Sequence, residues 1–554
     1  MKPFRVLTIV VLTVFFSVFM VLPLYTVVSQ GLDPAIIGEA LASPVYQTGL
    51  FNAFKIAIVT TCLVFLISLP LAMLYDRFEF PGKTMVNMLM MLPMILPPFV
   101  GALGFQQIFG HYGVLNSALQ YFSIAPVDWL GGEGRFYAVC LIEALHLYPI
   151  LYLNLVTALA NVDPSLDEAA RNLGAGRLRR FLKITLPLIR PGIFAGGSIV
   201  LIWSFTELGT PLMLGYNTVT TVQIFNGITE LETNPLPYAL VVIMLLLSAG
   251  LYSFSRLALG SNGSAQMMKG STGTVTRTLK YYQAWLCSGV FALITFCAVL
   301  PHMALTFGAF GLDWYGSVLP KSYTMMHFEN ALSHEIVIPS IMNSLKYSSL
   351  AMLVCIAIGL PAALLIVRWR PKGWQLFDVM IMMPLAVPGI IMAFGYLSMC
   401  ARNPWLNQIF DPIANPTLLL AAAYAMRRLP YVVRAVAAGL EQTPETLEEA
   451  ARNLGASSWM TLRRIVVPLI GANLVVGALF AFSFSMLEVS DSLILAQKSA
   501  FYPITKAIFE LSQILGEGSY IACAFGLWAM AFLACTLLTA SILLGKKLGS
   551  LFKF

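Results

Sequence analysis

Residues 168–175 read Glu-Ala-Ala-Arg-Asn-Leu-Gly-Ala, and the same eight residues return at 449–456. The offset between the two copies is 449 − 168 = 281, close to half of the 554 residues. Each copy lies in a polar segment between long apolar runs and is followed at one fixed distance by a proline, Pro187 or Pro468. Because an octapeptide rarely recurs by chance at such a spacing, the sequence predicts two homologous halves that each display one identical loop.

The composition is that of a protein embedded in a lipid bilayer. Hydrophobic residues make up 58% of the chain and charged residues 11%, and the mean hydropathy is +0.80. Soluble domains carry about one quarter charged residues, so these values exclude a soluble protein and predict a polytopic membrane protein. The net charge of +7 is attributed to orientation in the bilayer, and no nucleic-acid partner is expected.

Twelve apolar runs are long enough to span a membrane, six in each half. The first is expected to be a retained span and not a secretory signal, because it is too long for a signal peptide and lacks an A-x-A site. Backbone exposed to lipid must satisfy its hydrogen bonds internally, so all twelve are expected to be helices. They lie near residues 6–28, 49–74, 84–110, 136–160, 193–215, 236–259, 281–307, 342–367, 375–400, 416–440, 472–496 and 520–545.

Basic residues are unevenly distributed among the connecting segments. The asymmetry predicts that both termini, the central linker and both repeated loops are cytoplasmic. An even number of spans in each half makes the halves parallel repeats. Basic residues of the segments assigned to the cytoplasm include Lys2, Arg5, Arg77, Lys83, Arg177, Arg179, Arg180, Lys183, Arg190, Arg256, Lys280, Arg368, Arg370, Lys372, Arg463, Arg464, Lys546 and Lys547.

Three parts are therefore expected along the chain. Residues 1–260 form the first repeat, with its loop at 163–190, and residues 280–554 form the second, with its loop at 443–471. Residues 261–279 connect them and are small, polar and glycine-rich, which is typical of a flexible cytoplasmic linker.

The repeated stretch resembles the EAA signature of type I ATP-binding-cassette importer permeases, with Glu-Ala-Ala, a following glycine and a later apolar-Pro pair. Since both copies are in one chain, the sequence is most similar to the fused permeases of iron(III), phosphonate and thiamine uptake systems. The resemblance implies an all-α fold of two parallel repeats of about six transmembrane helices. It also implies that each signature is a cytoplasmic helix-turn-helix that docks in a cleft of a separate ATPase.

Both copies carry signals for a short helix that ends at a glycine. Asp163 is the expected N-cap of the first, with Pro164 at the first helical position, and Thr443 and Pro444 are expected to repeat this arrangement. The acidic residue of each signature is expected either to meet donors in the ATPase or to pair with the arginine three positions on. The resemblance assigns ATPase coupling to Glu168, Ala169, Ala170, Arg171, Gly174, Pro187, Glu449, Ala450, Ala451, Arg452, Gly455 and Pro468.

The chain contains no G-x-x-x-x-G-K-[ST] phosphate-binding loop. It is therefore expected to hold no cofactor, with ATP and Mg bound by two copies of a cytoplasmic ATPase. The resemblance further implies a periplasmic or lipid-anchored substrate-binding protein and a bacterial inner membrane. The eight cysteines show no metal-type spacing, and no catalytic constellation is present, so a transport subunit is predicted, with no metal site and no enzymatic activity.

Charged groups inside spans are functional candidates because they are expensive to bury in lipid. One charged pair, Glu207 and Glu488, and one serine pair, Ser204 and Ser485, occupy equivalent positions of the two halves, at the offset of 281, beside the repeated loops. Two interpretations stay open: contact with the cargo, or mutual pairing, with Glu207 or Glu488 neutralising an arginine. His146 alone is more typical of a packing residue. The tentative translocation path comprises Glu143, His146, Ser204, Glu207, Arg427, Arg428, Ser485, Glu488 and Asp491.

The sequence thus predicts the transmembrane subunit of an ATP-driven, binding-protein-dependent importer. Iron(III) is the first choice of cargo by resemblance, and the carboxylates inside the spans are compatible with a cation. Arg427 and Arg428 point instead to a phosphonate, phosphate ester or other oxyanion, and thiamine remains open. A twelve-helix secondary transporter is the more remote alternative, and a membrane-embedded enzyme or scaffold is another. The twin loops argue against the carrier, because an ion-driven carrier needs no ATPase contact. An enzyme or scaffold would predict catalytic polar residues clustered in one half, whereas the polar features here follow the repeat.

Overall fold

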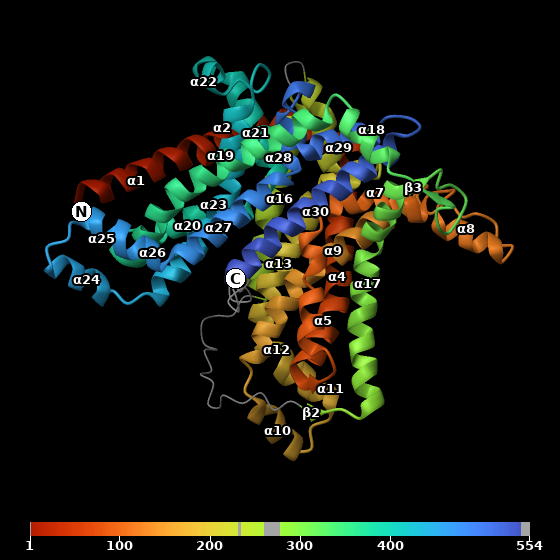
Figure 1. Cartoon of the computed structure of the whole chain (residues 1–554), viewed down its shortest axis with the longest axis horizontal. Coiled ribbons are helices and arrows are strands. Elements are labelled where there is room, and N and C mark those ends of the chain that lie inside the picture. The colour runs from red at the N-terminus through yellow and green to blue at the C-terminus, as the bar shows by residue number, and fades with distance from the viewer. Residues whose placement is uncertain (1, 231–233, 260–276, 545–554) are drawn as a thin grey trace. The chain divides into compact units, whose positions relative to one another are not determined.

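A computed structural model describes residues 2–230, 234–259 and 277–544, and almost all of the regular structure is helical (Figure 1). Contacts divide the chain into two compact units. Unit 1 comprises residues 1–42, 224–245 and 326–551, and unit 2 comprises residues 43–223, 246–325 and 552–554. Most of the predicted linker, 261–276, lies outside the described residues.

Unit 2 holds most of the first repeat together with one long helix of the second. Two short strand pairs accompany the helices, β1 with β2 in parallel and β3 with β4 antiparallel. Its elements are α4 (Pro44–Arg77), β1 (Phe78–Glu79), α5 (Lys83–Leu89), α6 (Leu92–Ile95), α7 (Pro98–Phe109), α8 (Val114–Tyr121), α9 (Gly134–Ala160), α10 (Pro164–Asn172), α11 (Arg177–Arg180), η2 (Phe181–Thr185), α12 (Leu186–Leu188), α13 (Arg190–Thr206), α14 (Gly209–Met213), β2 (Arg277–Thr278), α17 (Tyr281–Phe310), β3 (Gly311–Leu312) and β4 (Ser322–Tyr323).

Unit 1 holds most of the second repeat and the first helices of the chain. The boundary between the units runs through α15 (Thr220–Asn226) and α16 (Leu236–Leu259). The elements of unit 1 are α1 (Lys2–Phe16), η1 (Ser17–Val21), α2 (Leu22–Gly31), α3 (Pro34–Ala42), η3 (Gly227–Glu230), α18 (Met326–Ser333), α19 (Val337–Leu364), η4 (Leu365–Trp369), α20 (Trp374–Ala386), α21 (Gly389–Arg402), α22 (Pro404–Phe410), α23 (Thr417–Gln442), α24 (Thr446–Asn453), α25 (Ser458–Thr461), η5 (Leu462–Val466), α26 (Val467–Leu469), α27 (Gly471–Met486), α28 (Ser490–Leu495), η6 (Ser499–Phe501), α29 (Ile504–Ser512) and α30 (Gly518–Leu544).

The prediction of an all-α membrane protein is confirmed. Among the described residues, eight helices are long and apolar enough to cross a membrane, and three bent pairs of helices raise the number to 11. The pair α20–α21 bends by 100° at Pro388, where proline cannot donate a backbone hydrogen bond. The remaining predicted run coincides with α23, which has 26 residues and carries Arg427, Arg428 and Arg434. Every predicted run is therefore helical, but the most charged one is not a continuous apolar span.

A three-helix bundle forms the core of each unit. In unit 2, α4, α9 and α13 pack together, and in unit 1 the equivalent helices α19, α23 and α27 do the same (Figure 1). Side chains with few polar atoms fill the interfaces, and the buried Ser68 hydroxyl donates to the Tyr148 carbonyl between α4 and α9, at 2.9 Å. The bundles place the same helices of each repeat, the second, fourth and fifth predicted spans, at the centre of their unit.

The first helix of each repeat packs in the unit formed mainly by the other repeat. In unit 1, α2 packs on α21, and in unit 2, α17 packs on α7. Glycines permit this close approach: a Cβ on Gly104 would lie 1.7 Å from the Pro301 carbonyl oxygen, and one on Gly395 3.0 Å from the Pro23 carbonyl oxygen. The compact units therefore do not coincide with the predicted sequence repeats 1–260 and 280–554, because each unit takes its first helix from the other repeat.

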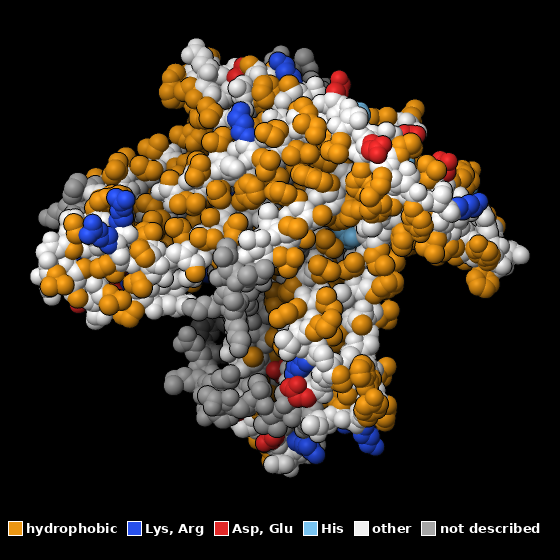
Figure 2. Space-filling view, in the orientation of Figure 1, with side chains coloured by type: hydrophobic (Ala, Val, Ile, Leu, Met, Phe, Trp, Pro, Cys, Tyr) orange, Lys and Arg blue, Asp and Glu red, His pale blue; other side chains and the backbone are white. Residues whose placement is uncertain are grey.

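Figure 2 shows apolar side chains over long stretches of the helices in both units, and lysine and arginine at the ends where α24–α25 and α10–α11 lie. Large exposed apolar side chains include Leu286 and Leu293 of α17 and Leu353 of α19. Such a surface is stable only against lipid, with charges at the helix ends.

Candidate functional site

The two repeated segments, here called loop 1 (163–190) and loop 2 (443–471), share one backbone design. In both, a short helix ends at a glycine with left-handed backbone, Gly174 with φ +79° and Gly455 with φ +84°. The following amide bonds back to the helix, from Ala175 N to Ala170 O and from Ala456 N to Ala451 O, each at 3.0 Å. This pattern closes a helix C-terminus, and only glycine adopts the required angle at low cost. The predicted helix-turn-helix is therefore confirmed in both loops.

The N-terminal ends of the two short helices differ. Asp163 caps α10 as predicted, since its Oδ1 accepts a hydrogen bond from Ser165 N at 2.9 Å. The equivalent prediction for Thr443 is wrong. Its hydroxyl donates to the Gly439 carbonyl at 2.9 Å and so belongs to the end of α23, while α24 begins only at Thr446.

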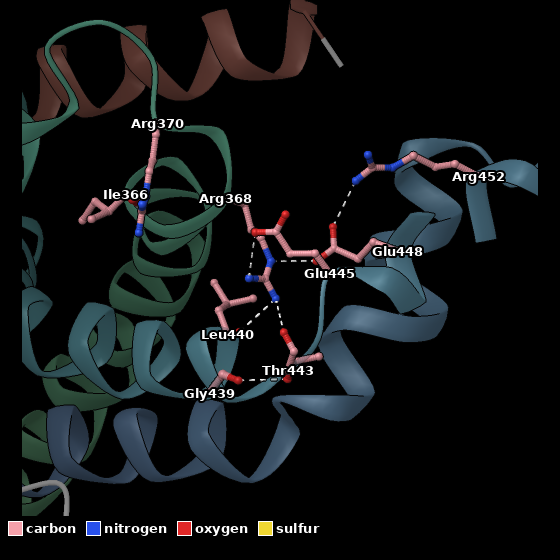
Figure 3. Close-up of polar contacts among 9 residues, drawn as sticks. All are labelled: Ile366, Arg368, Arg370, Gly439, Leu440, Thr443, Glu445, Glu448 and Arg452. Carbon is pink, nitrogen blue, oxygen red and sulfur yellow. Dashed lines mark hydrogen bonds and ion pairs between the residues drawn. The ribbon is translucent and has the colours of Figure 1, made fainter. Parts of the chain in front are cut away.

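Of the two alternatives for the signature glutamates, pairing of Glu168 with Arg171 and of Glu449 with Arg452 is not seen among the described residues. Arg452 Nη2 instead donates to Glu448 Oε2 at 3.1 Å (Figure 3). The residue equivalent to Glu448 is Asp167, since 448 − 167 = 281, and its Oδ2 accepts from Arg180 Nη1 at 2.6 Å. The acid before the signature glutamate braces each loop because it lies one residue earlier on the helix and faces inward.

The remaining signature side chains stay at the surface. Glu168 and Glu449 are exposed and form no ion pair among the described residues. Leu173 and Leu454, at equivalent positions, are 88% and 89% exposed. Exposed leucines beside free carboxylates are typical of a surface that another protein covers. The predicted list omitted these leucines, although they are part of the repeated octapeptide.

The other predicted loop residues lie beside this surface. Ala450 and Pro468 in loop 2 are exposed like Ala169 in loop 1, whereas Ala451 is buried against its own loop. Ala170 and Pro187 are partly buried, and Arg171 is exposed. Each loop therefore presents one exposed apolar and acidic face; the opposite face of α24 buries Glu448 and Ala451, whereas that of α10 is only partly buried.

Three charged side chains of the predicted path come together in unit 1. Arg427 Nη1 donates to Glu488 Oε1 at 2.7 Å, and Arg428 Nη2 donates to the other oxygen, Glu488 Oε2. Arg428 Nη2 also donates to the Phe484 carbonyl at 3.1 Å. Glu488 is only 5% exposed. Of the two open interpretations, mutual pairing is therefore what this structure shows for Glu488 and both arginines.

Asp491 lies at the edge of this cluster. Its Oδ2 is 3.9 Å from Arg427 Nη1, and neither carboxyl oxygen has a hydrogen-bond partner among the described residues. The Ser485 hydroxyl is likewise buried without a partner there. Tyr424 and Thr505 complete the polar wall, the first bonded to Ser492 Oγ at 2.6 Å and the second donating to the Glu488 carbonyl at 2.7 Å.

The equivalent cluster in unit 2 contains the carboxylates of Glu143 and Glu207 and no arginine among the described residues. Glu143 is 2% exposed, and no hydrogen bond reaches either of its carboxyl oxygens among the described residues. The hydroxyl groups of Thr60 and Ser204 and the carboxylate of Glu207 are its polar neighbours. The Glu207 carboxylate accepts hydrogen bonds from the Gly209 and Thr210 amides at 3.1 and 3.3 Å. This cluster is rich in oxygen ligands, whereas that in unit 1 is internally neutralised.

Both clusters adjoin a break in the third predicted span. His146 Nδ1 is 2.8 Å from the Pro93 carbonyl, which has no helical donor because the residue four positions on is Pro97. His146 is thus a hydrogen-bonded residue at the break. Arg427 occupies the equivalent position, since 427 − 146 = 281, and lies against Gly389 so closely that a Cβ there would be 2.1 Å from its Nη1.

Among the described residues, no group of three His, Cys, Asp or Glu side chains is arranged to hold a metal ion. The eight cysteines are unpaired. What the described residues do support is contact with a partner at the exposed faces of loops 1 and 2 and polar contacts beside the buried charges of the two clusters.

The family described as binding-protein-dependent transport system inner membrane component matches residues 68–259 and 355–544. A putative ferric transport system permease protein, FbpB 1, of Haemophilus influenzae is 28% identical over 459 residues, covering 80% of this chain and 69% of the relative. The ferric transport system permease protein FbpB of Actinobacillus pleuropneumoniae is also 28% identical, covering 82% of this chain and 65% of the relative. A putative 2-aminoethylphosphonate transport system permease protein, PhnU, of Salmonella paratyphi A is 30% identical over 41% of this chain and 78% of its own length.

The two matched ranges cover more than half of the chain, and each contains one of the two loops. The chain therefore belongs to the binding-protein-dependent transport system inner membrane components: it is a multi-pass permease of the inner membrane, a non-catalytic subunit of an ATP-binding-cassette importer that works with ATPase and binding-protein partners.

Proposed function

We propose that this permease carries iron(III) across the inner membrane, and that loops 1 and 2 are the contacts for two copies of a cytoplasmic ATPase that binds ATP and Mg. A periplasmic or lipid-anchored binding protein delivers the cargo on the opposite side, and both termini are cytoplasmic. The observation that carries the coupling role is the exposed, duplicated face of each loop, with Leu173 or Leu454 beside a free carboxylate.

The coupling role follows from what two identical faces on one chain can do. A partner that binds both must present the same cleft twice, as a dimer of identical subunits does. Burial of a leucine side chain contributes roughly 1.5–3 kcal/mol to association, and the free glutamates supply charge complementarity for a basic cleft. When the two partner subunits close, the loops move with them, and the helices joined to the loops reorient.

Iron(III) is supported by the names of two relatives and by the buried carboxylates. Hard trivalent and divalent cations prefer oxygen ligands, and unit 2 offers Glu143 and Glu207 together with the hydroxyls of Thr60 and Ser204. Glu143 and Asp491 both have carboxyl oxygens without hydrogen-bond partners among the described residues, but Asp491 lies 3.9 Å from Arg427. Glu143 is therefore the carboxylate of the path best suited to meet a passing cation.

A phosphonate or another oxyanion is the second candidate, supported by the name of the Salmonella relative and by Arg427 and Arg428. Glu488 already engages both guanidinium groups, so an oxyanion would have to displace this carboxylate. Iron(III) is therefore preferred, and thiamine has no specific observation in its favour.

Uptake in proteoliposomes containing the permease, its ATPase and its binding protein tests both parts of the proposal. We expect ATP-dependent accumulation of radiolabelled iron(III) that unlabelled 2-aminoethylphosphonate does not reduce. Accumulation of labelled 2-aminoethylphosphonate without that of iron would reverse the choice of cargo. Uptake that persists without the ATPase would refute the coupling role.

A further inference from the structure

One arginine at the end of α19 connects three elements around loop 2. After α19 the chain continues through the π-helical turn η4 and reverses at Arg370, whose φ is +37°. This turn directs Arg368 toward the end of α23 and the start of α24 (Figure 3). The Arg368 side chain is only 8% exposed.

All three guanidinium nitrogens of Arg368 are engaged. Nε donates to Glu448 Oε1 at 2.8 Å and Nη1 to Glu445 Oε1 at 3.3 Å. Nη2 donates to the carbonyl oxygens of Leu440 at 2.9 Å and Thr443 at 2.7 Å (Figure 3). A planar guanidinium with several bonds in different directions fixes the geometry of its acceptors far better than a single ion pair does.

The acceptors explain why an arginine is placed here. The carbonyl groups of Leu440 and Thr443 are at the C-terminal end of α23, where the helix dipole is negative and the last carbonyls lack helical donors. Glu445 and Glu448 are at the N-terminal end of α24. One cation therefore satisfies the end of one helix and the acidic start of the next, and it joins both to α19.

Loop 1 lacks this connection. Arg77 follows Pro70 of α4 by seven residues, as Arg368 follows Pro361 of α19 by seven (77 − 70 = 7; 368 − 361 = 7). Among the described residues, Arg77 forms no hydrogen bond or ion pair with loop 1. The carboxylate equivalent to Glu448, that of Asp167, pairs instead with Arg180 inside the same loop.

We propose that Arg368 is a positioning residue that ties loop 2 to α19 and α23, so that the second half transmits movement of the ATPase to the membrane helices through a stiffer joint than the first. This inference rests on the proposed coupling role of the loops. The two loops would then transmit movement to their membrane helices to different extents, although their exposed octapeptides are identical.

Amide hydrogen exchange in the complete complex of permease and ATPase, in lipid nanodiscs with and without ATP and vanadate, tests the inference without knowledge of the cargo. The variants are Arg368→Gln and the matched control Arg77→Gln. We expect the nucleotide-dependent change of exchange in α19 and α23 to fall at least about fivefold in Arg368→Gln, the lower end of typical coupling between sites. The change within α24 persists, because the exposed face of the loop is intact, and Arg77→Gln behaves as the wild type.

If Arg368→Gln does not assemble, Glu448→Gln serves as the second variant. This substitution removes the carboxylate that accepts from Arg368 Nε and leaves the carbonyl acceptors of the arginine in place. We expect the same loss of the nucleotide-dependent change of exchange in α19 and α23. A wild-type response in α19 of Arg368→Gln or Glu448→Gln, or an equal loss in Arg77→Gln, overturns the inference. Failure of the wild-type permease to retain the ATPase refutes the proposed coupling role itself, and the two failures are thus distinguishable.

Discussion

Replacement of Glu488 by glutamine tests whether the buried cluster of unit 1 is a structural ion network. Glu488 is 5% exposed and its carboxylate binds Arg427 and Arg428, whose side chains are 22% and 14% exposed. The substitution leaves two largely buried cations with only Asp491, 3.9 Å from Arg427, as a counter-charge. Loss of one partner of a buried ion pair typically lowers stability by about 3–5 kcal/mol.

The matched control is Glu207→Gln at the equivalent position of unit 2. There the carboxylate accepts two backbone amides, of Gly209 and Thr210, and a glutamine carbonyl oxygen can accept the same bonds. We expect this variant to lose only about 1 kcal/mol. Equilibrium unfolding of the purified permease in mixed micelles, followed by tryptophan fluorescence, measures both. If Glu488→Gln is no less stable than Glu207→Gln, the interpretation of Glu488 as the neutralising partner of both arginines is refuted.

Three further predictions follow from the packing, the loops and the path. Gly104→Ala should lower stability by about 1–3 kcal/mol, because its Cβ would lie 1.7 Å from the Pro301 carbonyl oxygen, whereas Gly197→Ala, with nothing within 4 Å, should be neutral in the same unfolding assay. Glu168→Lys combined with Glu449→Lys should abolish uptake while the thermal unfolding midpoint stays unchanged, since both side chains are exposed; normal transport would count against the coupling role. Glu143→Gln should reduce the initial rate of iron(III) uptake by at least about tenfold with ATPase binding intact, and an unchanged rate would remove Glu143 from the path.

The duplicated sequence predicted a large part of this fold because two signals in it are local. Apolar runs longer than a bilayer is thick can only be helices in lipid, so all twelve predicted runs fall on helices, although only eight to 11 of them qualify as spans among the described residues. Gly174 and Gly455 likewise mark helix ends through their own backbone preference, without reference to the rest of the chain.

Features that depend on tertiary partners were not predictable in this way. Neighbouring acids on a helix face directions about 100° apart, and the sequence does not tell which one faces the loop, so the bracing role was considered for Glu168 and Glu449 and not for Asp167 and Glu448. The pattern of apolar residues in a span also does not indicate which other helix the span contacts. The packing of α2 on α21 and of α17 on α7 could therefore not be predicted from the sequence.

The bridging role of Arg368 was not predicted for a third reason, a change of register between the repeats. The offset of 281 holds for the loops and for Glu207 and Glu488, but Pro70 and Pro361 are 361 − 70 = 291 residues apart. The first half is therefore ten residues longer than the second between these prolines and the loops (291 − 281 = 10), so the offset of 281 does not align the end of α19 with the end of α4. A comparison anchored on the prolines would have aligned Arg368 with Arg77, although only contacts in the structure distinguish their roles.

Site-specific photo-crosslinking from positions 173 and 454 tests the central claim most directly. A photoreactive amino acid replaces Leu173 or Leu454 in cells that express the whole transporter. A third variant carries it at Tyr121, which is 80% exposed and lies between the third and fourth predicted spans, on the side of the membrane opposite to the predicted cytoplasmic loops. The account predicts crosslinks to the ATPase from positions 173 and 454 and none from 121. Absence of ATPase crosslinks from both loop positions, or crosslinks from Tyr121 alone, would contradict it.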